Sequence, residues 1–220
     1  MAKAVTGRIE LVGVSSHKIF GPVGEKSGHR RDGWETAIKV DRMTSPLTPA
    51  SVLSEVSRTY DRRVMNNVHR SEYVEAIVAL ALKDSGWKRM TPWDSWDCEH
   101  ESGVRLEVKQ SASAQGWGER SSLPRFDIAP RTGYWIDGGR QWVNQTGRHA
   151  DIYVFAWHGE PRDTADQRDP GAWEFYVVLK RDLPARKTIG LAAIRSRAAP
   201  RGVEELGVAV ERSRTAIRPP

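Results

Sequence analysis

A carboxylate and an amine, Glu107 and Lys109, lie two positions apart in a segment whose side chains alternate between polar and apolar. Such alternation over residues 104–109 is typical of a β-strand with one buried face and one polar face. Both charged groups then project from the same face. Together they could act on a phosphate, because the carboxylate can hold a divalent cation and the ammonium group can stabilise developing negative charge.

A second carboxylate, Asp97, is expected to lie beside this pair. Residues 101–103 (Glu-Ser-Gly) favour a turn, and Gly103 can adopt the positive φ that a tight turn requires. A hairpin centred on Ser102 places Asp97 directly across from Glu107, on the same face of the strand pair. Opposed carboxylates repel each other, and a cation between them would remove that penalty. Mg²⁺ suits such a site, because it binds one or two carboxylates and completes its shell with water and phosphate oxygens.

The arrangement resembles the Asp…(Asp/Glu)-x-Lys signature of the PD-(D/E)xK nuclease superfamily. Asp97 is followed ten positions later by Glu107-Val108-Lys109, which is the only acidic-x-Lys in the chain, although Trp96 stands where the family often has proline. The resemblance covers residues 66–180. It implies an α/β fold with a central mixed β-sheet flanked by helices, a restriction-endonuclease-like core. It also implies Asp97, Glu107 and Lys109 as catalytic residues and Mg²⁺ as the cofactor, held by Asp97 and Glu107, with Mn²⁺ as a substitute.

A helix is expected over residues 66–85, starting at a capping Asn66 or Asn67 and ending at Gly86. Its apolar residues form one stripe at helical spacing. Glu75 falls at the border of this stripe, from which it could reach a site beside the sheet. It also matches the acidic helix position of the family, so we include Glu75 among the catalytic residues. The plainer alternative is a solvent-facing helix residue.

Polar and basic residues after Lys109 are candidates for contacts with nucleic acid. Aromatic residues and arginines interleave between residues 116 and 148, as they do on surfaces that bind bases and phosphates. Most tryptophans fill cores instead, so the arginines are the stronger candidates. The residues that we expect to contact nucleic acid are Gln110, Ser111, Gln115, Arg120, Arg125 and Arg148. Among the scattered histidines, only His149, beside a predicted central strand, is one that we would test as a general base.

The rest of the chain predicts the elements around this motif. The apolar run 150–157 indicates a buried central strand, 172–179 indicates another strand, and 201–213 indicates a final helix. We expect a nuclease domain over residues 51–220, with a basic C-terminal tail. Residues 1–50 are expected to form a β-rich extension.

Composition narrows the class of protein. The chain has 220 residues, 39% of them hydrophobic, a net charge of +6 and one cysteine, Cys98. No apolar run is long enough to span a membrane, and no signal-peptide core is visible, so we expect a cytoplasmic protein without a membrane partner. The centre of the sequence is acid-rich and both ends are basic, which suits a metal-binding core whose ends attract a polyanion.

These observations predict a Mg²⁺-dependent endonuclease that hydrolyses DNA, with restriction or other defence against foreign DNA as the favoured role. A homodimer would suit symmetric cutting of a duplex. Two alternatives stay open. One is a non-catalytic nucleic-acid-binding subunit that retains the nuclease fold. The other is an RNA nuclease, because no residue can be assigned to reading a 2′-hydroxyl.

Overall fold

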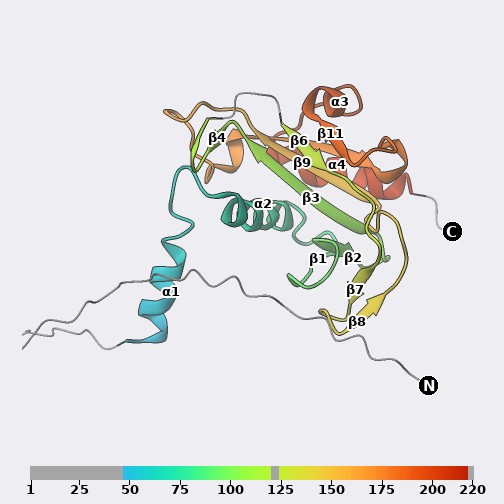
Figure 1. The fold of residues 1–220 in the computed structure, drawn as a ribbon, viewed down its shortest axis with the longest axis horizontal. Coiled ribbons are helices and arrows are strands. Elements are labelled where there is room, and N and C mark those ends of the chain that lie inside the picture. The colour runs from blue at the N-terminus through green and yellow to red at the C-terminus, as the bar shows by residue number, and fades with distance from the viewer. Residues whose placement is uncertain (1–46, 120–123, 218–220) are drawn as a thin grey trace, which may run out of the picture. The chain divides into compact units, whose positions relative to one another are not determined.

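A five-stranded sheet forms the centre of the protein (Figure 1). The computed structural model describes residues 47–119 and 124–217, so the predictions for Arg120 and for all but the last residues of the N-terminal extension lie outside it. The sheet order is β1 (Trp87–Arg89), β2 (Cys98–His100), β3 (Arg105–Ala112), β9 (Ile152–His158) and β10 (Trp173–Leu179). The β3–β9 pair is parallel and the others are antiparallel. The predicted α/β class with a mixed central sheet is confirmed.

Strand β9 is buried along its whole length, between β3 and β10. Its continuous apolar sequence is explained by this position, because both faces of the strand are covered. The strands predicted over 150–157 and 172–179 are therefore present as β9 and β10, with boundaries shifted by one or two residues.

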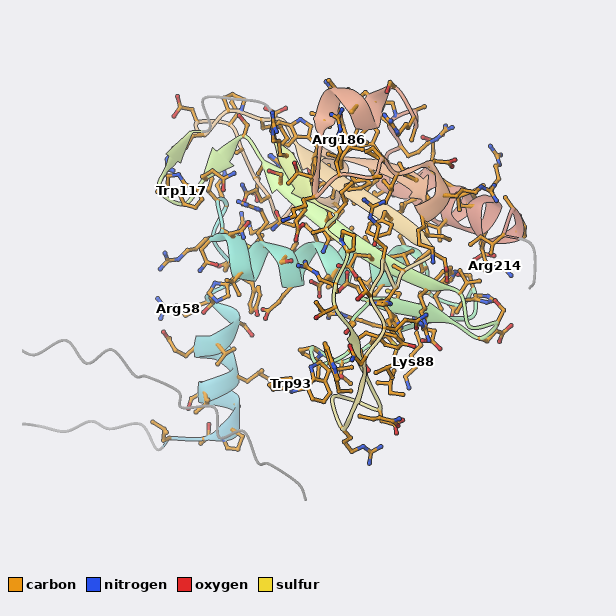
Figure 2. All side chains as sticks on the ribbon, turned by 45° about the vertical axis from the view of Figure 1, so that its right-hand side comes forward. Arg58, Lys88, Trp93, Trp117, Arg186 and Arg214 are labelled. Atoms are coloured by element: carbon orange, nitrogen blue, oxygen red, sulfur yellow. The ribbon has the colours of Figure 1, made fainter. Side chains whose placement is uncertain are left out.

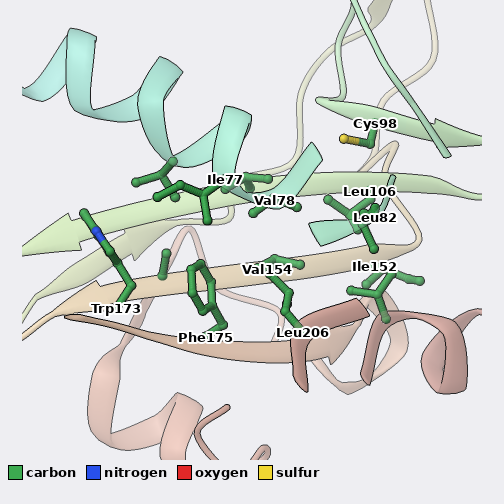
Figure 3. Packing of buried hydrophobic residues seen from close by; sticks show 14 residues of the cluster. Ile77, Val78, Leu82, Cys98, Leu106, Ile152, Val154, Trp173, Phe175 and Leu206 are labelled. Atoms are coloured by element: carbon green, nitrogen blue, oxygen red, sulfur yellow. The ribbon is translucent and has the colours of Figure 1, made fainter. Parts of the chain in front are cut away.

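Two hydrophobic clusters pack on opposite faces of the sheet. One cluster joins the sheet to α2 (Asn67–Ala81) and α4 (Val203–Thr215) through Val74, Val78, Leu206 and their neighbours (Figure 3). The other contains Phe155 on β9 and the short helix α3 (Leu191–Arg195). The predicted C-terminal helix is α4, and helix α1 (Pro49–Ser57) has no buried residue.

Small β elements occupy the segment that joins the parallel strands β3 and β9. They are β4 (Ala114–Gln115) with β5 (Gly118–Glu119), β7 (Tyr134–Ile136) with β8 (Gln141–Val143), and β6 (Arg125–Asp127), which pairs with the later strand β11 (Thr188–Gly190). Two 3₁₀ turns, η1 (Pro170–Ala172) and η2 (Lys180–Asp182), flank β10. Sequence periodicity did not reveal these short pairs, because two or three residues are too few to establish a period.

Helix α2 starts where the capping residue predicts. The Asn66 side chain accepts a hydrogen bond from the backbone N–H of His69 at 3.0 Å, which satisfies one of the unpaired donors of the first turn. The helix ends at Ala81, earlier than expected, and the chain then turns through positive φ at Asp84 and Gly86. An added Cβ at Gly86 would lie 2.8 Å from the His100 ring, so glycine is needed there for space as well.

None of the helices in the described ranges combines the length and apolarity that a bilayer crossing requires.

Candidate active site

The β2–β3 hairpin has the predicted register. Cys98 pairs with Leu106, Glu99 pairs with Arg105, and Gly103 adopts a φ of +81° in the turn. These pairs place the centre of the hairpin at Ser102, as expected. The alternation of β3 is also confirmed, because Leu106 is buried in the cluster with α2 while its neighbours face the other side.

Asp97 lies one position beyond the last pair of this ladder, and it holds the β3 backbone on both sides of Glu107. The Asp97 N–H donates to the Leu106 carbonyl at 2.9 Å, and Asp97 Oδ2 accepts from the Val108 N–H at 2.6 Å. The carboxylate therefore occupies the place of a backbone partner between the two strands. This position brings it next to the acidic-x-Lys segment.

Asp97 and Glu107 line different hollows, although their charges interact. Asp97 lines a groove beside α2, whereas Glu107 lines a small cavity together with Tyr153. After burial, the charge of Glu107 is the largest cause that raises the pKa of Asp97, so the two carboxylates are close enough to interact. The Asp97 side chain turns toward the Val108 N–H where the ladder ends.

Glu107 and Lys109 form an ion pair with each other, and both side chains are mostly buried. They line a cavity of about 40 Å³, with Ser95, Asp127, Ile128, Ala129, Arg131, Arg148, His149, Ala150 and Tyr153. This volume is enough for about one water molecule. The lysine is thus held against the carboxylate that precedes it by two residues, as the alternation of the strand requires.

Glu75 of α2 and Asp97 share the groove, which has a volume of about 900 Å³. One wall is α2 and the other is the chain between β1 and β2. Glu75 Oε2 accepts from Arg89 Nη2 at 3.3 Å, and its side chain is 23% exposed, so the border position inferred from the helix stripe is confirmed. The acidic residues that line this groove are Glu72, Glu75, Asp94 and Asp97, against one arginine, Arg89.

Burial is the main cause that raises the pKa of Asp97, to about 8, and the neighbouring charges of Glu107 and Glu75 raise it further. The hydrogen bond from the Val108 N–H and the charge of Lys109 oppose this shift. The charge of Asp97 therefore interacts with the charges of both Glu107 and Glu75. This environment disfavours the charged form of Asp97 unless a cation is present to compensate its charge.

The oxygen donors at this place suit a hard cation such as Mg²⁺. A buried carboxylate whose charge is opposed by two other carboxylates is stabilised by a cation, and Asp97 is in that situation. Within the described ranges, no three His, Cys, Asp or Glu side chains converge on one point at which protein groups alone could enclose a metal ion. Asp97 could therefore hold a cation only if water or ligand oxygens completed its coordination, as they usually do for Mg²⁺.

His149 contributes a nitrogen to the cavity of Glu107 and Lys109. Its Nε2 is buried and has no hydrogen-bond partner among the described residues, and its ring lies 4.4 Å from the ring of Tyr134, centre to centre. Burial lowers the pKa of His149, and the charges of Arg105 and Lys180 lower it further, while Glu107 raises it. These surroundings favour the neutral imidazole, whose unprotonated nitrogen can accept a proton.

Gln110 belongs to a polar network on the α2 side of β3. Its Oε1 accepts from Arg70 Nε at 2.6 Å, and its Nε2 donates to Asn67 Oδ1 at 3.1 Å. Arg70 is almost completely buried. The network ties the start of α2, which lines the groove, to the end of β3. Both polar atoms of the Gln110 side chain are already hydrogen-bonded, so few hydrogen bonds are left for the predicted contact with nucleic acid.

Ser111 and Gln115 are buried, at 4% and 1% exposure. Gln115 accepts from Arg70 and donates to the Ala112 carbonyl. Neither side chain is exposed for contact with a ligand, contrary to the prediction that both contact nucleic acid. The strand continues beyond Lys109 into the interior instead of ending at the surface, which the local pattern did not indicate.

The two described arginines of the predicted set differ. Arg125 is exposed on β6. Arg148 donates to the carbonyls of Ile128, Pro184 and Arg186 at 2.7 to 2.9 Å, so its guanidinium joins loops and has few donors left for a phosphate. Arg125 is therefore the better candidate for contact with a polyanion.

Near the site, the sequence did not point to Asp127, and Arg131 was one of the interleaved arginines considered for phosphate contact. They pair with each other at 2.7 Å and line the cavity of Glu107 and Lys109. Their position depends on the pairing of β6 with β11 across some sixty residues, for which the local sequence carries no signal. Comparison of the sequence with models of known protein families and with curated proteins gave no match.

Proposed function

We propose that this protein is a Mg²⁺-dependent nuclease that hydrolyses DNA phosphodiester bonds. The observation that carries the proposal is the buried Asp97 carboxylate, which accepts from the Val108 N–H within the acidic-x-Lys segment and lies near Glu107 and Glu75. Such a group favours a bound cation over a bare charge. The acid-x-Lys motif lies on the strand that Asp97 clamps.

Each residue of the proposed site has a separate task. Asp97 and Glu107 would hold the cation, with Mn²⁺ able to replace Mg²⁺, and Glu75 would act through water from the groove. The bound ion would polarise a phosphoryl oxygen and lower the pKa of a bound water. Lys109 would orient the attacking water or stabilise the charge that develops on the phosphate.

The acidic groove supports a role for the cation in substrate binding as well. Its four carboxylates would repel a phosphate backbone, so a substrate could approach Asp97 only when their charge is compensated. We expect binding of DNA in the groove to require a divalent cation for this reason.

Further parts of the proposal rest on the family resemblance. The motif on a β-hairpin, the acidic residue on α2 and the mixed sheet agree with a restriction-endonuclease-like core. Restriction or another defence against foreign DNA in the cytoplasm is the role that we favour, and a twofold dimer would suit symmetric cutting.

The proposal is tested with the purified protein, a DNA duplex and Mg²⁺. We expect cutting by the wild type and none by a Lys109→Ala variant that keeps the wild-type circular dichroism spectrum. Lys83→Ala, at an exposed position beyond the end of α2, is the matched control and should cut normally. Normal cutting by Lys109→Ala would refute the assignment.

A second candidate is a nucleic-acid-binding subunit without catalysis. The ion pairs Glu107–Lys109 and Glu75–Arg89 favour it, because they already compensate two of the three acids without a metal. Calorimetry with Mg²⁺ or Mn²⁺ discriminates the two candidates. Absence of binding, or binding unchanged in Asp97→Asn, would favour the binding subunit.

RNA remains the alternative substrate. A matched RNA duplex in the cutting assay described above tests this alternative.

A further inference from the structure

The β7–β8 hairpin carries tryptophans on the face that points away from the core. Its inner face packs Tyr134 and Ile136 against the second hydrophobic cluster. Its outer face carries Trp135 and Trp142, which are cross-strand partners at 40% and 45% exposure, with ring centres 5.2 Å apart. The outer face of a two-stranded ribbon is ordinarily polar. Two large aromatic rings there indicate either support of the hairpin or a binding surface.

A third exposed tryptophan, Trp93, adjoins this hairpin from the chain between β1 and β2. Trp93 is 70% exposed, and it is labelled in Figure 2. Its side chain lies against the hairpin turn, because an added Cβ at Gly139 would be 2.8 Å from Trp93 Cβ. The Trp135 N–H donates to Ser95 Oγ at 3.0 Å. The three tryptophans therefore belong to one surface whose two parts are fixed to each other; we call it the tryptophan surface.

The tryptophan surface borders the candidate active site. Pro92 and Asp94, the neighbours of Trp93, line the groove that holds Asp97 and Glu75. A second hollow of about 370 Å³ is lined by the bases Lys88, Arg89 and Arg105 and by the acids Asp94, Glu99 and Asp137, of which Asp137 belongs to the hairpin turn. A substrate that reaches the groove can thus meet exposed indole rings within the same region.

The kind of exposed apolar residue identifies the kind of ligand. On the tryptophan surface the large exposed apolar residues are all indoles. The exposed aliphatic residues in the described part of the chain lie on or beside helices, at Leu47, Val52, Leu53, Val56, Val68, Leu80 and Val208. Because these rings lie beside the groove of the proposed nuclease site, nucleobases of its substrate are the ligand that suits them, since the π-face of any base can stack on an indole.

We infer that Trp93, supported by Trp135 and Trp142, stacks unpaired nucleobases, so that the substrate has a single-stranded stretch beside the bond that is cut. This inference rests on the proposed function and names its substrate class. Bases inside a duplex have both faces covered by their neighbours, so an exposed indole gains a stacking partner only from a base outside the duplex.

The test measures binding without cutting. Full-length protein with Lys109→Ala, which keeps both proposed metal ligands, is titrated with a fluorescent oligothymidylate and with a duplex of the same length, in buffer with Mn²⁺. We expect tighter binding of the single strand, and a loss of tenfold or more when Trp93→Ala is added, so that the preference for single strands falls with it. Trp93→Phe should retain most of the affinity, because a ring remains for stacking.

Trp117→Ala is the matched control. Trp117 is 76% exposed and lies in the β4–β5 hairpin, away from Trp93 (Figure 2). Equal losses in the Trp93 and Trp117 variants, or a duplex bound as tightly as the single strand, would overturn the inference. The inference would also be overturned if a protein partner quenched the fluorescence of Trp93 and the oligothymidylate did not.

The outcome separates this inference from the proposed function. Stacking that depends on Trp93 in a protein whose wild type cuts no nucleic acid would support the surface and refute the nuclease. Cutting by the wild type, with binding indifferent to Trp93, would support the nuclease and refute the surface.

Discussion

Asp97 is the residue at which structure and chemistry are most closely linked. Its Oδ2 replaces a backbone acceptor for the Val108 N–H, which fixes the carboxylate in a buried place beside two other acids. When no cation is present, the charged form of Asp97 destabilises the folded protein. Asp97 should therefore make the stability of the protein depend on pH.

We predict that, in EDTA, the free energy of unfolding of the wild type falls relative to Asp97→Asn as the pH rises from about 4 to about 8. The pKa of Asp97 is raised in the folded state, so between the unfolded and folded pKa values the folded state binds a proton that the unfolded state has lost. Stability then decreases with pH through this window. Asparagine can still accept from the Val108 N–H without a charge. At pH 8 the free energy of unfolding of Asp97→Asn should exceed that of the wild type by at least about 1 kcal/mol.

Thermal or urea unfolding at several pH values checks this prediction. Mg²⁺ added at pH 8 should stabilise the wild type and leave Asp97→Asn unchanged. Parallel stability curves for the two proteins across the whole range would show that the carboxylate bears no such charge penalty.

At His149 the relevant atom is the buried Nε2 in the cavity with Glu107 and Lys109. We predict that His149→Gln lowers the rate of DNA cutting by about 10²-fold, the usual contribution of a residue that accepts a proton. His149→Phe, which keeps a ring against Tyr134 but lacks the nitrogen, should be impaired to a similar extent. Single-turnover rates measure the effect, and a wild-type rate in either variant would limit His149 to packing.

At the scale of elements, the β2–β3 hairpin decides the relation between Asp97 and the acidic-x-Lys segment. Its turn depends on Gly103, which has a φ of +81°, and an added Cβ there would have no neighbour within 4 Å. The only cost of a side chain at this position is therefore the backbone conformation.

We predict that Gly103→Ala lowers the free energy of unfolding by about 1 kcal/mol, whereas Gly103→Asn costs less, because asparagine tolerates the left-handed region better. Urea unfolding of the two variants provides the comparison. A loss of several kcal/mol for alanine would mean that the turn makes contacts beyond those of its own backbone.

Helix α2 is positioned by a different set of interactions. Asn66 caps its start, and Val74 and Val78 pack against the sheet, which leaves Glu75 at the wall of the groove. The cap and the apolar stripe are both local features of the sequence, and this explains why the helix and the place of Glu75 on it were predicted correctly.

At the scale of the whole molecule, the sheet separates two hydrophobic clusters, and β9 contributes to both. Phe155 lies in the cluster opposite α2 and has no exposed surface. Its register partner on the neighbouring strand β3 is Lys109, so the same strand pair supports both the core and the candidate site.

We predict that Phe155→Ala lowers the free energy of unfolding by about 3–5 kcal/mol, as is usual for a fully buried aromatic residue. Leu80→Ala, at a position 71% exposed on α2, is the control and should change it by less than about 0.5 kcal/mol. Chemical denaturation followed by circular dichroism gives both values. A small effect at Phe155 would be inconsistent with the packing of the second cluster.

The sequence by itself determined the features that depend on neighbours along the chain. The alternation of β3, the turn at Gly103, the cap of α2 and the apolar run of β9 all follow from local periodicity and backbone preference, and the structure has each of them. Only the tertiary structure decided that Asp97 lines the groove beside α2, that Ser111 and Gln115 are buried, and that Asp127 joins the cavity. These outcomes depend on where a ladder ends and on strands paired across long separations, and such contacts leave no trace in the local pattern.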